Sequence, residues 1–189
     1  MRINRAREKT ACRRFNIGAG QFPLLYWTNL DEAPDALADI YAHVPPIPAA
    51  DASLDEIYCG HFLEHLTPTE ADAFLVECHR CLVPGGTLGI LVPDTREIMR
   101  RYVAGDNSAP IEYPSNTWHS AADLDAVCAL FLYSSVQDSP HRWSYDTTTL
   151  RRLLERHGFR VTGEIDRWED RRVAIGAWYQ CGLDAVKEL

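Results

Sequence analysis

Two glycines and a carboxylate form the first group of residues that could do chemistry. Gly18 and Gly20 follow the apolar segment 14–17, and a glycine lets the backbone approach a ligand because it has no Cβ. Asp31 comes eleven residues after Gly20, at the end of the next apolar segment. In nucleotide-binding α/β folds, an acid at this place accepts hydrogen bonds from ribose hydroxyls. The two features together predict a site for a nucleoside.

The spacing of these residues discriminates between ligands. A dinucleotide site uses G-x-G-x-x-G, an acid about 20 residues later, and a full helix whose N-terminus faces the pyrophosphate. Here the last glycine is absent, Pro23 interrupts the segment, and eleven residues leave no room for a full helix. The pattern favours a nucleoside ligand without phosphates, such as S-adenosylmethionine.

Histidines form the second group. His61, Glu64 and His65 give the string H-x-x-E-H, in which two histidines on one helix face could hold zinc. Because the third ligand of such a site cannot be identified from the sequence, we expect no metal. His65 is then expected to pack or cap its own segment, and a zinc hydrolase stays open as an alternative.

His141 is a candidate base, because histidine titrates near physiological pH. It lies in the polar and aromatic segment 141–146, just before a helix expected to begin near Thr147. Residues 95–146 are less regular than the rest, and we expect them to form an insertion that acts as a substrate lid. Aromatic and imidazole side chains that could join His141 there are Trp118, His119 and Tyr133.

Strand-like and helix-like segments alternate along the chain, which indicates an α/β layered domain. Thr67-Pro68-Thr69-Glu70 has the spacing of a capping box and predicts a helix that Pro84-Gly85-Gly86 ends. Further helices are expected over 96–103, from Ser120 and from Thr147. Strands are expected near 14–17, 26–31, 36–40, 56–59, 87–92, 159–168 and 172–180, the last two as an antiparallel pair at a sheet edge.

Composition narrows the possible partners. At 189 residues the chain has the size of one domain. Residues 1–14 carry six basic and one acidic side chain, whereas the remainder carries 13 basic and 26 acidic ones. We expect residues 1–13 to be a solvated basic arm, and the acidic body argues against nucleic-acid binding. Without a membrane span or a secretory segment, the expected protein is cytoplasmic, with reduced cysteines.

A series of motifs along residues 14–180 resembles the class I S-adenosylmethionine-dependent methyltransferases. The resemblance is closest to small bacterial and phage-type members with a shortened first helix. It implies a three-layer Rossmann-like sandwich with a mostly parallel sheet and an antiparallel C-terminal strand pair. The matching segments are, in order, Asn16–Gly20, Asn29–Asp31, Ala38–Ile40, Ser53–Leu66 and Arg80–Leu88.

The resemblance also implies a role for individual residues. The backbone at Gly18, Ala19 and Gly20 would lie along the methionine part of S-adenosylmethionine, and Asp31 would bind its ribose. Two departures from the family pattern are Asn16, which replaces an acid but is still expected to contact the cofactor, and Phe22, which replaces a glycine. The remaining expected positions are Asp39 and Ile40 around the adenine, and Gly60 and His61 at the transfer pocket.

Methyl transfer from S-adenosylmethionine to a small molecule is therefore the function that the sequence predicts. The sulfonium already activates the methyl group, so the protein mainly aligns the acceptor and excludes water. His61 and His141 are the candidate catalytic bases. A methyltransferase-like binding protein without catalysis is the other alternative, and the sequence does not define the acceptor or the oligomeric state.

Overall fold

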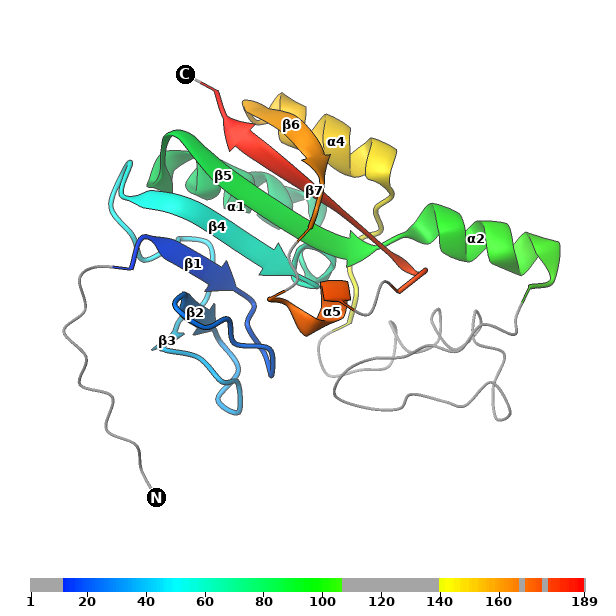
Figure 1. Cartoon of the computed structure of the whole chain (residues 1–189), viewed down its shortest axis with the longest axis horizontal. Coiled ribbons are helices and arrows are strands. Elements are labelled where there is room, and N and C mark those ends of the chain that lie inside the picture. The colour runs from blue at the N-terminus through cyan, green and yellow to red at the C-terminus, as the bar shows by residue number, and fades with distance from the viewer. Residues whose placement is uncertain (1–11, 107–139, 167–168, 175–176, 189) are drawn as a thin grey trace.

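The computed structural model describes residues 12–106, 140–166, 169–174 and 177–188, and its centre is a seven-stranded sheet (Figure 1). The strands follow one another across the sheet in the order β3-β2-β1-β4-β5-β7-β6. Their bounds are β1 (Arg14–Ile17), β2 (Thr28–Asp31), β3 (Ile40–Tyr41), β4 (Leu54–Gly60), β5 (Leu82–Pro93), β6 (Phe159–Glu164) and β7 (Gln180–Lys187).

The sheet is mostly parallel. β1 pairs in parallel with β2 and β4, β2 with β3, and β4 with β5, whereas β7 runs antiparallel to both β5 and β6. This arrangement confirms the predicted α/β class, with its mostly parallel sheet and antiparallel C-terminal strands. Because β1, β2 and β4 are parallel, the residues that follow them meet at one edge of the sheet.

Two helices cover one face of the sheet and form the main core. They are α1 (Pro68–Cys81) and α4 (Thr147–Arg156). The predicted capping box of α1 is present: the Thr67 hydroxyl accepts a hydrogen bond from Glu70 N, and the Glu70 carboxylate accepts one from Thr67 N at 2.8 Å. Buried side chains of this core include Ile17, Ile57, Phe74, Leu75, Ile90, Leu150, Leu154 and Leu183.

The opposite face has a much smaller apolar cluster. Side chains alternate along a strand, so Tyr58 points away from the main core that Ile57 and Cys59 join. Tyr58 packs there with Leu24 and Trp27. The short helix α5 (Arg171–Ala174) lies on this side, and α2 (Thr95–Ala104) projects beyond the end of β5 (Figure 1).

Three expectations about the elements are wrong. Of the strand expected over 36–40, only Ile40 lies in β3. The strand expected over 172–180 is replaced by α5 and by a later strand, β7, that begins at Gln180. The helix expected to run up to Pro84 ends at Cys81, because Leu82 already pairs with Leu54 as part of β5. The glycine turn lies within β5, and the pairing between β4 and β5 shifts its register there.

Part of the expected lid lies outside the described residues, including Trp118, His119, Tyr133 and the helix from Ser120. Within the described ranges, none of the helices combines the length and the apolar character that crossing a bilayer requires.

Candidate functional site

The glycine bend and Asp31 lie together at the carboxyl edge of the sheet. Gly18 and Gly20 have φ angles of +69° and +50°, a region that glycine enters without a Cβ clash. Asp31 ends β2, and its carboxylate accepts hydrogen bonds from Gly20 N at 2.8 Å and from Ala33 N at 2.9 Å. A carboxylate offers about four lone-pair sites, so the group that fixes the bend keeps acceptor capacity for ligand hydroxyls.

Two buried asparagines hold the loop that follows the glycine bend, at the place where a longer first helix would otherwise pack. Asn16 and Asn29 are buried on neighbouring strands, and Asn16 Nδ2 donates to Asn29 Oδ1 at 2.9 Å. Asn16 Nδ2 also donates to Phe22 O at 3.2 Å, and Asn29 binds both the N–H and the carbonyl of Leu24. The structure thus places the Asn16 amide beneath the loop after the bend, where it holds that loop against the sheet.

The residues expected around an adenine ring have structural contacts of their own. The Asp39 carboxylate accepts hydrogen bonds from Asn29 N at 3.0 Å and from Asn29 Nδ2 at 3.2 Å. Ile40 is half-buried and packs on the main core. Both residues lie at β3, beside the strand that carries Asp31.

His61 directly follows β4 and lies at the same edge of the sheet. His61 Nδ1 lies 3.1 Å from Glu64 Oε1, and His61 Nε2 lies 3.1 Å from Gln180 Oε1. The Gln180 amide is oriented by its Nε2, which donates to Arg172 O at 2.6 Å. Both groups that face the ring, a carboxylate oxygen and an amide oxygen, are hydrogen-bond acceptors.

The end of β4 also lies against the glycine bend. A Cβ on Gly18 would come within 2.7 Å of the Phe62 ring, and Phe62 itself packs on Phe74 at 5.2 Å between ring centres. Gly18 is therefore required both for its positive φ angle and for this close approach. The contact joins the predicted methionine end of the site to the histidine segment.

Sequence reasoning missed a buried ion pair beside Gly60. Asp170 and Arg172 are almost fully buried and form a salt bridge of 2.8 Å. Tyr58 donates its hydroxyl to Asp170 at 2.5 Å, and Arg172 Nη1 donates to Gly60 O at 2.6 Å. Burial alone would raise the pKa of Asp170, but the hydrogen bonds and charge of Arg172 hold that pKa below its ordinary value.

Glycine is the residue that this packing allows at position 60. A Cβ there would lie within 3 Å of the Tyr58 hydroxyl, Arg172 Nη2 and Asp170 Oδ2. The guanidinium of Arg172 also lies 4.7 Å from the centre of the Phe22 ring, so the ion pair connects β4 to the loop after the bend. The sequence carries only a weak signal for it, an acid and a base two residues apart in a charged segment.

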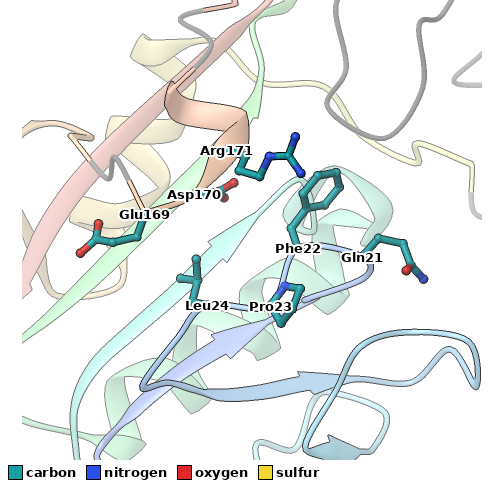
Figure 2. A pocket seen from close by; sticks show the side chains of 7 residues that line it. All are labelled: Gln21, Phe22, Pro23, Leu24, Glu169, Asp170 and Arg171. Atoms are coloured by element: carbon teal, nitrogen blue, oxygen red, sulfur yellow. The ribbon is translucent and has the colours of Figure 1, made fainter. Parts of the chain in front are cut away.

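A small cavity of ≈ 190 Å³ lies between that loop and the segment before α5 (Figure 2). The residues expected to bind a cofactor do not line it, so the cavity is adjacent to the candidate site and separate from it. Its lining residues are Gln21, Phe22, Pro23, Leu24, Glu169, Asp170 and Arg171.

The structure brings His141 to the other side of Glu64. Arg142 N and Trp143 N donate to Glu64 O at 2.7 and 3.2 Å, which fixes the segment before α4 against the short helix η1 (Leu63–His65). The rings of His65 and His141 lie 4.9 Å apart in an edge-to-face arrangement. Burial lowers the pKa of His141, which favours the neutral form of its ring.

The sequence and the fold resemble those of known proteins. Residues 27–90 match the family model described as a methyltransferase domain. An S-adenosylmethionine-dependent methyltransferase from Archaeoglobus fulgidus has 16% sequence identity and a TM-score of 0.54, with 94% of this chain and 87% of that chain covered. One from Methanosarcina mazei has 14% identity and a TM-score of 0.56, covering 93% and 92%. The chain has the class I methyltransferase fold.

A longer methyltransferase shows the same likeness. Phosphoethanolamine N-methyltransferase 2 from Haemonchus contortus, solved with S-adenosyl-L-methionine, has 12% identity and a TM-score of 0.55, with 97% of this chain and 50% of that chain covered. A search of curated proteins by sequence finds no match. The domain match and the fold confirm the resemblance to class I methyltransferases and support S-adenosylmethionine as the cofactor; the phage-type subgroup stays a prediction.

Proposed function

We propose that this methyltransferase-fold protein transfers the methyl group of S-adenosylmethionine to a small-molecule acceptor. The observation that carries the proposal is the convergence of the glycine bend, Asp31 and the end of β4 at one edge of the sheet. The Gly20–Asp31 hydrogen bond joins the two groups assigned to opposite ends of the cofactor. The acidic body of the chain supports a small molecule over a nucleic acid as acceptor.

Each predicted residue has a role in this proposal. Asp31 binds the ribose hydroxyls, while the backbone of Gly18, Ala19 and Gly20 lies along the methionine part. Asn16 acts indirectly by holding the loop after the bend. The positions assigned to the edge of the adenine and to the transfer pocket are Asp39, Ile40, Gly60 and His61.

Of the two predicted bases, His141 is the better placed to accept a proton. A base needs a lone pair, and both nitrogens of His61 face hydrogen-bond acceptors. Burial lowers the pKa of His141, which favours the neutral ring that a base needs. We therefore assign His61 a positioning role, in which it orients Glu64, and leave proton acceptance in the metal-free protein to His141.

Calorimetric titration of the full chain with S-adenosylhomocysteine tests the cofactor part of the proposal. We expect one binding site and a loss of affinity of about 10- to 100-fold in Asp31→Ala, because hydrogen bonds to a charged group are among the stronger ones. Asp35→Asn is the matched control, since Asp35 is exposed nearby and contributes its backbone carbonyl to Gln21. A folded wild-type sample that gives no heat of binding contradicts the proposal.

A catalytically inactive binding protein is the second candidate. It is supported by Arg172, whose guanidinium donates a hydrogen bond to the Gly60 carbonyl and stacks on the Phe22 ring beside the bend. Such a protein binds S-adenosylhomocysteine but releases no labelled methyl group to any acceptor in a pool of small molecules. Methyl incorporation that His141→Ala reduces, with cofactor affinity unchanged, excludes this candidate.

A further inference from the structure

Two distant segments converge on a buried carboxylate. Glu64 lies in η1, and His141 lies 77 positions later, yet the backbone hydrogen bonds from Arg142 and Trp143 to Glu64 O hold the two segments together. One possible ligand atom from each of Glu64, His65 and His141 lies within 4.8 Å of the others. The sequence string H-x-x-E-H offered two of these residues, and the fold supplies the third.

The carboxylate itself indicates a cation. Glu64 is 1% exposed, and its Oε1 faces His61. Its Oε2 is buried and has no hydrogen-bond partner among the described residues. A buried charged oxygen without a partner is costly. An ion bound by this oxygen together with one nitrogen each of His65 and His141 would satisfy it.

We propose that Glu64, His65 and His141 bind a divalent transition-metal ion of the zinc type. Two imidazoles and one carboxylate are a ligand set of Zn²⁺ and of similar borderline ions, whereas Mg²⁺ and Ca²⁺ prefer sites built from oxygen alone. Ligand atoms about 2.1 Å from a tetrahedral ion lie ~3.4 Å apart. The candidate ligand atoms lie within 4.8 Å of one another, so the half-buried His65 and His141 side chains would move closer together on binding an ion.

His61 supports the site without being a ligand. Metal-binding groups are commonly oriented by hydrogen bonds from neighbouring side chains. His61 Nδ1 lies 3.1 Å from Glu64 Oε1 and His61 Nε2 lies 3.1 Å from Gln180 Oε1, so this contact engages one carboxylate oxygen and leaves Oε2 for the ion. This arrangement differs from the zinc-hydrolase interpretation of the string, in which His61 and His65 would be the ligand pair.

An ion with three protein ligands keeps a coordination position open. An oxygen or nitrogen of the acceptor would bind the ion at that position. This acceptor role rests on the proposed methyl transfer, but binding of the ion does not. In the ion-bound protein His141 would be a ligand, and the ion would supply the Lewis acidity that activates the acceptor.

Titration of the metal-stripped full chain with Zn²⁺ tests the proposal. We expect one high-affinity site and at least a 100-fold loss of affinity in His65→Ala and in His141→Ala. His43→Ala is the matched control, because His43 is exposed and pairs with Glu32 away from the cluster. Circular dichroism verifies that each variant is folded, and Glu64→Gln is added as a near-isosteric change of the third ligand.

Titration with Co²⁺ gives a readout that is independent of activity. Binding at this cluster produces visible absorption bands in the wild type and in His43→Ala, and these bands disappear in His65→Ala and His141→Ala. Zinc or cobalt binding that the ligand variants leave unchanged overturns the proposal, because another group such as the cysteines then holds the ion. Binding of S-adenosylhomocysteine to the metal-stripped protein is measured separately, so failure of the cofactor proposal is distinguished from failure of the metal site.

Discussion

The face of the sheet beneath α1 and α4 is packed with aliphatic and aromatic side chains, whereas the opposite face near the ends of β1 and β4 is held by polar contacts. On the first face, Phe74, Leu150 and Leu154 are fully buried against the strands. On the second face, the segments are held together by the Asn16–Asn29 hydrogen bond and the Asp170–Arg172 ion pair. A full first helix is absent there, and these contacts hold the loop that replaces it.

The two faces therefore contribute differently: the apolar face mainly stabilises the fold, and the polar face mainly positions the site. Apolar burial is non-directional and stabilises in proportion to area, so the first face can support the sheet without defining any particular geometry. Hydrogen bonds and ion pairs contribute less on balance but fix orientation. The polar face is accordingly the one that positions the glycine bend, Gly60 and His61.

The largest expected effect comes from the apolar face. Phe74→Ala removes a fully buried ring that packs on Phe62, and we expect it to lower the free energy of unfolding by about 4 kcal/mol, through lost burial and a cavity. Val76→Ala is the control on the same helix, because the Val76 side chain is 59% exposed. Urea denaturation measures both. Equal losses for the two variants would contradict the assignment of this core.

The ion pair on the polar face gives the next effect. Arg172→Met leaves Asp170 buried without its cation, and we expect a loss of about 3 kcal/mol, limited because Tyr58 still donates to the carboxylate. Adding Asp170→Asn removes the unpaired charge. The double variant is therefore expected to lose less than the sum of the single losses, by about 1–3 kcal/mol. Strictly additive losses in urea denaturation would show that the two side chains do not interact.

The sequence was most informative where local and tertiary preferences agree. β1 has the predicted bounds, and α1 begins at the predicted capping box, since both signals depend on neighbouring residues. The strand predicted over 172–180 failed because the continuous apolar run 173–179 resembles a buried strand, whereas Arg172 lies in a short helix and forms a buried salt bridge. β7 contains Gly182 and Asp184, which favour strands weakly, and pairing with both neighbours overrides that preference.

Within the candidate site, too, some contacts could be predicted from the sequence and others could not. The bend and Asp31 could be predicted because they lie eleven residues apart and follow consecutive strands. The contact of His141 with His65 could not, because it depends on how the chain returns after the long segment beyond β5. The ion pair between Asp170 and Arg172 could not be predicted either, because residue type alone does not distinguish a buried charge from an exposed one.

The smallest expected effect is the response of the polar face to acid. The Asp170 pKa is lowered in the folded protein, so its ionised form stabilises the fold above the unfolded-state pKa of about 3.9, and this contribution is lost as the pH falls toward the folded pKa. The stability difference between wild type and Asp170→Asn should therefore stay constant from pH 8 to about pH 5 and shrink below about pH 4. Urea denaturation of both proteins at each pH cancels the contributions of other titrating groups. A difference that already shrinks between pH 7 and pH 5 would mean that Arg172 does not hold Asp170 ionised, and that this face is less tightly fixed than the contacts indicate.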